Sequence, residues 1–429
     1  MHRSSTCRLL AALLLICSLG ILEDARAERL PLSPPESVGL SGPRLERIAT
    51  AVDRAIEEER IAGAVTLVMR HGKVAWIRAQ GHLDQEAGRP MTPDTIFRIC
   101  SMTKPITSSA VMMLYEEGQF LLGDPISRFI PEFKDPKVLV TGEGPAYTIP
   151  AKREITIRDL LRHTSGLTYQ WNATLGPLYR EAEVTHGLIR DPRTLDEVVA
   201  LLAAQPLLFS PGERYEYGLS TDVLGRLVEV VSGMPLDRFF QTRIFEPLQM
   251  KNSFFFVPDD EASRLAAAYT WYPEKGLQRF PAEPIVEDAF VYSSDYPHGG
   301  PTTFFSGGAG LSSTVGDYAR FCQMMLRNGK VGNTRLLSRK SVELMTGDQL
   351  GNVSAEVAFG LGFGILGTKS PLPEIASPGR FGWGGFFYTH FFVDPEEDMI
   401  GIFMGQLHPA GGLDLDRLFE VLAYQAIDD

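Results

Sequence analysis

The pattern of apolar and polar residues near the start of the chain predicts one helix followed by one hairpin. Residues 42–60 repeat apolar side chains at helical spacing, which is typical of an amphipathic helix with one buried face. Residues 62–81 form two runs that are rich in β-branched residues on either side of His71-Gly72. A short turn between two such runs predicts a β-hairpin.

The pattern then becomes helical and returns to strands near the C-terminus. Helical spacing recurs in 106–120, 195–205, 219–233 and 314–330. Strand patterns return in 360–366, 386–395 and 398–406, and a last helix is expected at 413–427. We therefore predict the α+β class: one sheet assembled from the terminal segments, about 28–105 and 355–429, with a helical subdomain inserted at about 106–354. The Pro/Gly-rich stretch 281–310 predicts a long loop of the kind that often lines a site.

Residues 1–27 have the features of a signal peptide. Two early arginines precede an apolar run from Leu9 to Leu22, and Ala25-Arg26-Ala27 fits a signal-peptidase site. The apolar run is short for a membrane-spanning helix, which needs about 20 residues. We expect a mature protein that starts near Glu28 and is periplasmic or secreted. A retained N-terminal anchor is the alternative, and lipid attachment at Cys17 is less consistent with the bulky residue before it.

Composition and charge exclude several classes of protein. The 429 residues carry a formal net charge of −12, which disfavours binding to nucleic acid through phosphate neutralisation. No further segment has the composition of a membrane span, and no Cys/His spacing indicates a metal site, so we expect no cofactor. The remaining cysteines, Cys100 and Cys322, can form one disulfide or can each be a small buried apolar residue.

The strongest candidate for chemistry is Ser101, because Lys104 follows it three residues later. Positions i and i+3 share a helix face, so the amine can reach the hydroxyl if a helix starts at Ser101. Pro105 agrees with that start, since proline is tolerated in a first helical turn. Serine needs a base before it can act as a nucleophile, and lysine serves only where burial or a nearby cation favours its neutral form. Alone, the same spacing also fits a serine that merely caps a helix.

Other hydrolytic signatures are missing from the sequence. The Gly-x-Ser-x-Gly elbow of the Ser/His/Asp hydrolases does not occur, and neither does the His-Glu-x-x-His zinc motif. A Gly-rich phosphate-binding loop is absent as well. A Ser/Lys mechanism is therefore the remaining serine-based hypothesis.

Several segments together resemble the serine β-lactamase-like hydrolases, and most closely the family VIII carboxylesterases. The likeness spans roughly residues 35–425 and rests on the order and spacing of its motifs. The segments that carry it are "ICSMTKPITSSAVMMLYEEG", "DPISRFIPEFKDPKVLV", "LLRHTSGL", "FSPGERYEYGLSTDVLGRLVEVVSG", "GGAGLSSTVGDYARF" and "GRFGWGGFFYTHFFVDPEEDMIGIFMGQ". The resemblance implies a sheet flanked by helices with a helical lobe beside it and the site between the two.

The resemblance also implies roles for residues in the first two motifs. Ser101 would be the acylated nucleophile and Lys104 its base partner. Tyr217, with Tyr215 as the other candidate, would share the proton transfer. Leu219 stands where the family's Tyr-x-Asn motif has its amide, and would contact the substrate.

The third motif, usually Lys-Thr-Gly, reads Trp383-Gly384-Gly385 here. Its glycines would let the substrate approach the strand closely, and the next N–H, at Phe386, would pair with that of Ser101 as an oxyanion hole. His163 and His390 are expected to be structural, and Ser313 or Thr314 is expected to cap the helix that follows.

The departures from the family pattern predict the substrate. Trp383 replaces the lysine that would pair with a substrate carboxylate, which favours neutral small-molecule esters with short acyl chains. Some of the following aromatic residues are expected to line the pocket and others to be core: Phe304, Phe305, Trp383, Phe386 and Phe387. A β-lactamase, a D-amino-acid peptidase or an acyltransferase with the same site is the alternative. A non-catalytic binding protein is the alternative from another class, and the oligomeric state stays open.

Overall fold

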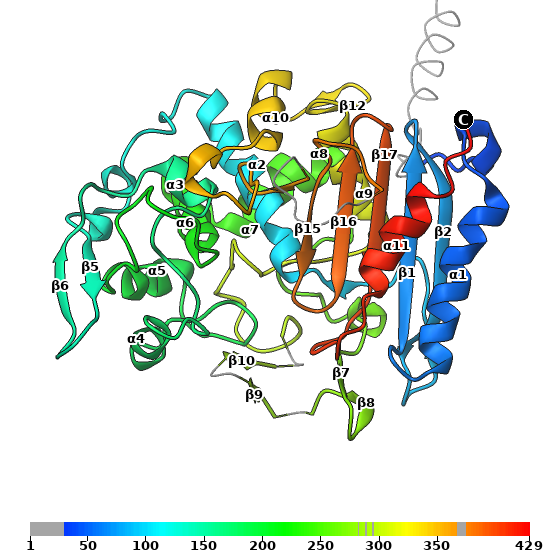
Figure 1. Ribbon diagram of the computed structural model, residues 1–429, viewed down its shortest axis with the longest axis horizontal. Coiled ribbons are helices and arrows are strands. Elements are labelled where there is room, and N and C mark those ends of the chain that lie inside the picture. Colours follow the sequence, from blue (N-terminus) through cyan, green and yellow to red (C-terminus); the bar gives the residue numbers. More distant parts are fainter. Residues whose placement is uncertain (1–29, 282, 288–289, 294–295, 367–374) are drawn as a thin grey trace, which may run out of the picture.

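An antiparallel sheet joins the two ends of the chain. The computed structural model describes residues 30–281, 283–287, 290–293, 296–366 and 375–429. The strand order is β14-β15-β16-β17-β1-β2-β3 (Figure 1). The strands are β1 (Gly63–Arg70), β2 (Lys73–Asp84), β3 (Arg89–Pro90), β14 (Gly364–Ile365), β15 (Phe381–Gly385), β16 (Thr389–Asp394) and β17 (Met399–Met404). The C-terminal strand β17 pairs with the N-terminal strand β1, with Val65 opposite Met404.

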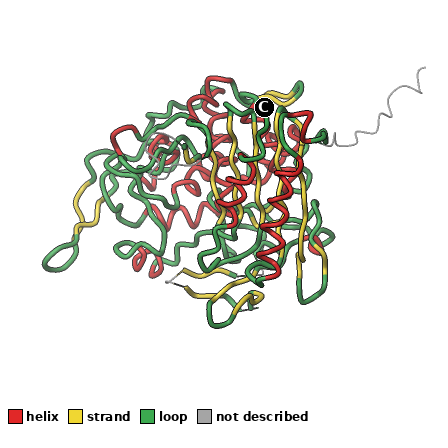
Figure 2. The backbone as a smooth tube through the Cα atoms, turned by 45° about the vertical axis from the view of Figure 1, so that its right-hand side comes forward, coloured by secondary structure: helices red, strands yellow, loops and turns green. Residues whose placement is uncertain are grey.

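Helices cover both faces of this sheet, and strand β1 is buried throughout as a result. Alternate side chains of a strand point to opposite faces. Val65 and Leu67 belong to the main core, whereas Ala64 and Val68 pack in a second core beneath helices α1 (Gly42–Glu57) and α11 (Leu415–Tyr424). Figure 2 shows the strands running between these two helices and the larger helical part of the molecule.

The helical part lies against the other face of the sheet and contains helix α2. From Thr103 to Leu114, every residue of α2 is buried, which fixes its N-terminus between the sheet and the helical part. The helices of this part are α2 (Thr103–Glu116), α3 (Ile157–Leu161), α4 (Gly176–Glu181), α5 (Leu195–Ala203), α6 (Ser220–Ser232), α7 (Leu236–Phe240), α8 (Glu246–Leu248), α9 (Val315–Leu326) and α10 (Arg339–Thr346).

Short strand pairs lie outside the main sheet, in the segments that connect the helices. They are β4 (Phe97–Arg98) with β11 (Ser312–Ser313), β5 (Lys137–Val140) with β6 (Tyr147–Pro150), β7 (Tyr269–Tyr272) with β8 (Gly276–Arg279), β9 (Ile285–Glu287) with β10 (Phe290–Tyr292), and β12 (Lys330–Val331) with β13 (Thr334–Arg335). In the β4/β11 pair, strand β4 ends three residues before Ser101.

The predicted α+β architecture is confirmed, and its elements agree with the sequence patterns in most places. The helix expected at 42–60 is α1, and the expected hairpin is β1 and β2, with His71 and Gly72 at φ of 53° and 75° in the turn. The strand expected at 360–366 is shorter than predicted, since only Gly364–Ile365 pair as β14. The lobe boundaries stay a prediction, and the signal peptide at 1–27 lies outside the described residues.

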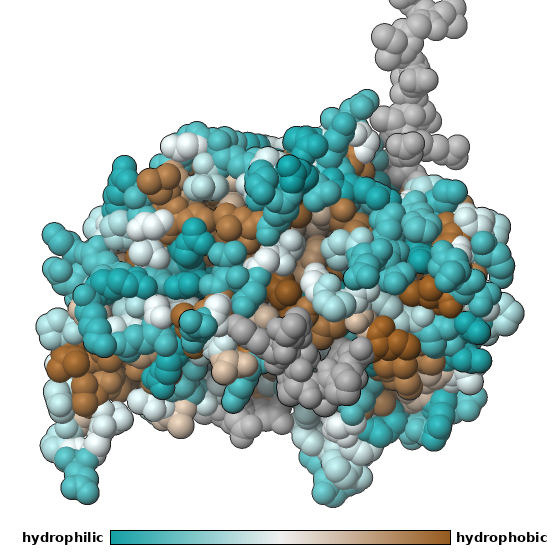
Figure 3. Space-filling view, turned by 45° about the horizontal axis from the view of Figure 1, so that its top comes forward, coloured by the Kyte–Doolittle hydropathy of each residue, from teal (hydrophilic) through white to brown (hydrophobic). Residues whose placement is uncertain are grey.

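The surface mixes polar and apolar residues. Figure 3 shows several separate apolar patches among polar side chains on the face that it presents. Exposed large apolar residues come from unrelated elements, for example Leu121, Ile149 and Leu418. Among the described residues, no helix is both long enough and apolar enough to cross a membrane.

Candidate active site

Ser101 lies in a short 3-10 helix, Cys100–Met102, that leads directly into α2. Cys100 has a φ of 44° in the left-handed region, which costs a residue with a side chain roughly 1–2 kcal/mol. The turn is tied to the residue just before strand β11, since the Ile99 N–H donates to the Leu311 carbonyl at 3.0 Å. The sequence placed the helix start at Ser101, and the α-helix proper begins two residues later.

Lys104 is buried, with 1% of its surface exposed, and lies one turn along from Ser101. Its Nζ donates to Ser101 Oγ at 3.2 Å, to the Tyr169 hydroxyl at 3.0 Å and to the Gly308 carbonyl at 2.8 Å. A lysine ammonium has three donors, so these three oxygens satisfy it completely. The buried amine is therefore held against the hydroxyl rather than left to rotate.

Tyr217 brings a second proton-carrying group to the same oxygen. Its hydroxyl donates to Ser101 Oγ at 2.8 Å, and Lys104 Nζ lies 4.7 Å from the centre of its ring. Tyr217 comes from the loop just before α6, so the three side chains arrive from two separate parts of the helical region. The structure thus brings together Ser101, Lys104 and Tyr217, as the sequence predicted.

Strand β15 supplies the opposite wall of the site. A methyl group on Gly385 would overlap the carbonyl oxygen of Ile99, so this strand lies directly against the turn that carries Ser101. The indole of Trp383 lies 5.4 Å from the Tyr217 ring, and its Nε1 donates to the Tyr217 hydroxyl at 3.4 Å. Glycine is what permits so close an approach of two backbones.

Phe386 follows β15 and lies beside the residue before Ser101. Burial raises the pKa of the Cys100 thiol to about 12, against the opposing effect of the backbone amides of Phe387 and Phe386. The Phe386 amide is therefore close to the Cys100 side chain, on the Ser101 turn. The oxyanion hole made by the N–H groups of Ser101 and Phe386 stays a prediction.

The sequence of this chain matches a known family over most of its length. The model of the beta-lactamase family, described as "Beta-lactamase", matches residues 48–425. The chain belongs to the beta-lactamase family. Its antiparallel sheet and flanking helices are those of this family, and it is a hydrolase of the serine β-lactamase fold with esterase relatives.

Two curated relatives of this beta-lactamase-family protein are equally similar to it. Esterase EstB of Burkholderia gladioli is 35% identical over 356 residues, which cover 81% of this chain and 86% of EstB. Protein Rv1367c of Mycobacterium tuberculosis strain H37Rv is 35% identical over 364 residues, with the same coverage of both chains.

A solved structure has the same fold over nearly its whole length. EstCE1, described as "a hydrolase with promiscuous acyltransferase activity", superposes with a TM-score of 0.76 at 27% sequence identity. The superposition covers 90% of this chain and 99% of EstCE1.

Leu219 does not contact the open site, which corrects the prediction that it binds substrate. It is 1% exposed and belongs to the main apolar core at the start of α6. An apolar side chain is stabilised by burial, whereas the amide of the family motif would need polar partners. The leucine therefore contributes to folding and leaves the substrate side of the loop to Tyr217.

The predicted aromatic pocket residues divide between site and core. Trp383 and Phe386 are partly exposed beside the site, whereas Phe304 and Phe387 are buried in the core. Phe305 packs instead on Phe255 and Phe256, with ring centres 5.4 and 5.9 Å apart. Two of the five aromatic residues thus lie at the site.

Tyr169 is a site residue that the sequence analysis missed. Its hydroxyl accepts from Lys104, and its ring lies 5.5 Å from that of Tyr217. Burial, followed by Tyr217, raises the pKa of Tyr169 well above its ordinary value, which keeps the phenol neutral. The segment "LTYQW" follows the turn that carries His163, but no spacing in it marks the tyrosine.

Gly308 is the second missed residue, because it contributes only a backbone carbonyl. Asp222, on α6, accepts from the Gly308 N–H at 3.2 Å and from the Ser306 hydroxyl at 2.5 Å. Burial raises the pKa of Asp222, while Ser306 and Lys104 oppose the rise. Asp222 therefore holds the Ser306–Gly308 end of the 281–310 stretch in place. That stretch was predicted to be a long loop, but it contains the strand pair β9 and β10, and it reaches the site through the Gly308 carbonyl, 2.8 Å from Lys104 Nζ.

His163 is structural in character. Burial, helped by Lys104, lowers its pKa to about 3, so the ring is neutral near pH 7. Its Nδ1 accepts from the Gly218 N–H at 3.4 Å, which steadies the residue after Tyr217. His390, on β16, has a pKa lowered to about 3 by burial, and Thr314 caps α9 by accepting from the Asp317 N–H.

The two cysteines outside the N-terminal 27 residues are both free. Cys100 and Cys322 are buried in the main core and form no disulfide. Of the two alternatives that the sequence left open, the buried apolar role is correct. In the part of the chain that the structure describes, no three His, Cys, Asp or Glu side chains gather as a metal site.

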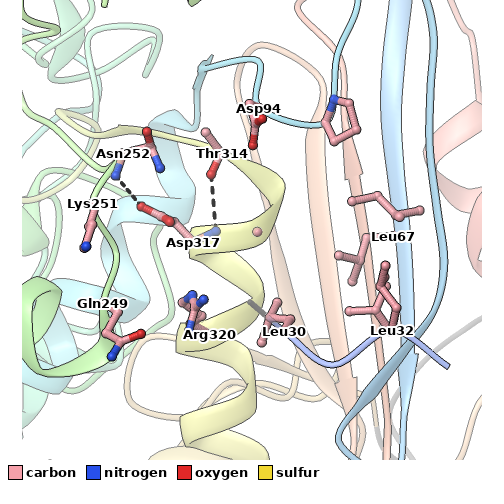
Figure 4. A pocket seen from close by; sticks show the side chains of 14 residues that line it. Leu30, Leu32, Leu67, Asp94, Gln249, Lys251, Asn252, Thr314, Asp317 and Arg320 are labelled. Carbon is pink, nitrogen blue, oxygen red and sulfur yellow. Dashed lines mark hydrogen bonds between the residues drawn. The ribbon is translucent and has the colours of Figure 1, made fainter. Parts of the chain in front are cut away.

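A separate hollow of about 960 Å³ lies between strands β1 and β2 and the start of α9 (Figure 4). Leu30, Leu32 and Leu67 line one side, and Asp317 and Arg320 lie across from them. The Asp317 carboxylate accepts from the Asn252 N–H, and its own N–H donates to Thr314. No serine or cysteine is among the residues that line this hollow, and the Ser101 site stays the candidate active site.

Proposed function

We propose that this protein hydrolyses neutral carboxylic esters with short acyl chains through an acyl intermediate on Ser101. One observation carries the proposal: Ser101 Oγ lies within hydrogen-bond distance of both Lys104 Nζ and the Tyr217 hydroxyl, at 3.2 and 2.8 Å. A hydroxyl held by two groups that can exchange protons is the arrangement that an activated serine needs.

In the acylation step, the Tyr217/Lys104 pair starts with one proton fewer than a phenol and an ammonium hold together. Ser101 Oγ attacks the ester carbonyl carbon and passes its proton to this pair, which fills that vacancy. The carbonyl oxygen becomes an oxyanion, which the N–H groups of Ser101 and Phe386 stabilise in this proposal. The tetrahedral intermediate then breaks its bond to the alcohol oxygen. That oxygen takes the proton back from the pair and leaves as the neutral alcohol.

Deacylation repeats the same steps with water. Water attacks the acyl carbon, gives its proton to the Tyr217/Lys104 pair, and restores the oxyanion. Ser101 leaves as the second intermediate collapses and recovers the proton, which releases the carboxylic acid. An alcohol in place of water would give a new ester, which is the acyltransferase activity described for EstCE1.

The preference for esters over β-lactams rests on Trp383. A lysine at this position would offer a charge to the carboxylate of a β-lactam, and a charge-assisted hydrogen bond is worth about 1.5–3 kcal/mol. Trp383 instead offers an indole, already directed at Tyr217. The name of the relative EstB supports the same substrate class.

A substrate panel tests the proposal. Phenyl acetate, phenyl butyrate and phenyl octanoate are compared with one chromogenic cephalosporin, and Ser101→Ala is the matched variant. We expect kcat/KM to be highest for the short esters, to fall for octanoate and the cephalosporin, and to be lost in Ser101→Ala. Turnover of phenyl acetate by Ser101→Ala at the wild-type rate would contradict the proposal, and faster turnover of the cephalosporin would favour the β-lactamase alternative.

We also propose that the protein is exported after removal of residues 1–27. The proposal rests on the apolar run and the Ala25-Arg26-Ala27 site in the sequence. Sequencing of the mature N-terminus tests it, with Glu28 as the expected first residue.

A further inference from the structure

Six aromatic side chains form a row that meets the Ser101 hydroxyl at Tyr217, whose own hydroxyl donates to Ser101 Oγ at 2.8 Å. On one side Trp383, Tyr217, Tyr169 and Trp171 follow one another, with ring centres 5.4, 5.5 and 4.3 Å apart. On the other side Phe290 lies 5.0 Å from Trp171 and 5.6 Å from Phe386, which is three residues from Trp383. The members of this row come from four separate parts of the sequence, 169–171, 217, 290 and 383–386.

Trp171 is the most exposed of these six aromatic side chains. It is 44% exposed, whereas Tyr169 and Phe290 are buried. Its ring lies nearly flat on Tyr169, with 31° between the planes. An exposed indole with one face supported by a fixed phenol is a platform on which another flat ring can stack.

One carboxylate holds both ends of the segment that carries Tyr169 and Trp171. Glu216 accepts from the Thr168 hydroxyl at 2.6 Å and from the Asn172 side-chain amide at 3.2 Å. These two residues flank the Tyr169–Trp171 segment on both sides. Because Glu216 also adjoins Tyr217 in the sequence, it holds the stacking platform at a set position relative to the catalytic phenol.

The chemistry decides which part of an ester reaches Trp171. The oxygen of the departing alcohol must face the group that returns its proton, which is the Tyr217/Lys104 pair. The carbonyl oxygen must face the backbone N–H groups on the β15 side. The substituent of the alcohol therefore leaves the reacting centre beside Tyr217 and Tyr169, and the next ring along that wall is Trp171.

We propose that Trp171 determines specificity by favouring esters whose alcohol carries a planar aromatic ring. This inference rests on the proposed function, since it assumes acyl transfer at Ser101. Lys104 is too deeply buried to offer a charge to this part of the substrate, so the selection is for a flat, neutral group. Aromatic pairs gain about 0.5–1.5 kcal/mol beyond their buried area, which corresponds to roughly a 2- to 12-fold preference.

A matched pair of substrates isolates the effect. Benzyl acetate and cyclohexylmethyl acetate are both acetates of primary alcohols and differ chiefly in the flatness of the ring. The quantity measured is the ratio of their kcat/KM values. We expect Trp171→Leu to lower this ratio by about 3- to 10-fold, mainly through KM, and Trp171→Phe to keep it within about twofold of wild type.

Two controls separate the outcomes. Trp271→Leu removes a tryptophan on β7 that packs on Arg60, and should leave the ratio unchanged. An unchanged ratio in Trp171→Leu, or an equal fall in Trp271→Leu, would overturn the inference while leaving the ester hydrolase intact. Should Trp171→Leu fail to fold, Trp171→Gln takes its place, because glutamine also lacks an aromatic face. A ratio lowered by about 3- to 10-fold supports the inference, and a ratio within about twofold of wild type rejects it. Loss of all esterase activity in Ser101→Ala tests the proposed function separately.

Discussion

Lys104 is a buried amine that donates one hydrogen bond to each of three oxygen atoms. These three hydrogen bonds explain why the amine can stay buried next to Ser101. An unpaired buried charge would cost several kcal/mol, so each partner contributes to the position of the amine. Ser101 and Lys104 could be predicted because both lie in one local motif. Tyr169 and the Gly308 carbonyl could not, because they reach the amine only through tertiary packing and carry no local signal.

We predict that Tyr169→Phe lowers kcat/KM for phenyl acetate by about 10- to 100-fold, because the Lys104 amine loses the hydroxyl oxygen that accepts one of its hydrogen bonds. Steady-state kinetics measure the effect. Tyr215→Phe is the control, since the Tyr215 ring packs on Phe359 and His163 in contacts that phenylalanine preserves. Equal losses in the two variants would contradict a specific role for Tyr169.

His163 gives a prediction for both activity and acid stability. Its pKa of about 3 lies below the ordinary 6.5, so between these values the unfolded chain binds a proton that the folded protein does not. The free energy of unfolding should therefore fall as the pH drops from about 6.5 towards 3, by about 1.4 kcal/mol per pH unit for this residue. Above pH 6.5 the residue adds no pH dependence.

His163→Asn should keep most of the esterase activity, because an amide oxygen can accept from the Gly218 N–H as the ring does. Urea unfolding between pH 4 and 7 should show a shallower acid slope than wild type. A variant without activity at pH 7 but with normal folding would instead make His163 part of the chemistry.

At the scale of elements, the site is a junction between strand β15 and the turn before α2. The strands and helices could be predicted because their apolar periods are clear, as in β1 and α1. The length of the strand at 360–366 was overestimated. Glycine alternates with apolar residues in this segment, which fits a strand as well as a loop, and only Gly364–Ile365 pair with another strand. The Leu219 side chain was wrongly predicted to face the substrate. Its place in the motif predicts the loop to which it belongs, but not the direction in which its side chain points.

We predict that Gly385→Ala reduces kcat/KM by about 100-fold, because the added methyl pushes β15 away from Ile99 and misplaces the Ser101 turn. Gly384→Ala is the neighbouring control, since its methyl would lie 3.3 Å from the Thr389 carbonyl and needs only a small adjustment. Kinetics and thermal melting are measured for both. A Gly385→Ala enzyme with normal kinetics would show that the close approach of the two backbones is not needed.

The whole molecule is held by its cores and not by a covalent cross-link between Cys100 and Cys322. Both thiols are buried, and burial raises both pKa values, that of Cys100 to about 12. The joining of both chain ends in one sheet, with β17 beside β1, makes folding depend on long-range pairing. The sequence left the disulfide open because a pair of cysteines does not reveal their separation.

We therefore predict that a reducing agent leaves the melting temperature unchanged. A thiol reagent should label neither Cys100 nor Cys322 in the folded protein, and both after unfolding in guanidinium chloride. Peptide mass spectrometry identifies the labelled sites. A melting temperature that falls on reduction would indicate a cross-link that the structure lacks.

The most direct test of the account is the covalent capture of the nucleophile. A p-nitrophenyl alkylphosphonate ester reacts with an activated serine, which expels p-nitrophenolate and leaves a stable phosphonyl group on the oxygen. Intact mass and peptide mapping should find one phosphonyl group per protein, on Ser101, with none on Ser101→Ala and slower labelling of Tyr217→Phe. Labelling of Ser101→Ala at the wild-type rate, or a phosphonyl group on another residue of the wild type, would contradict Ser101 as the nucleophile.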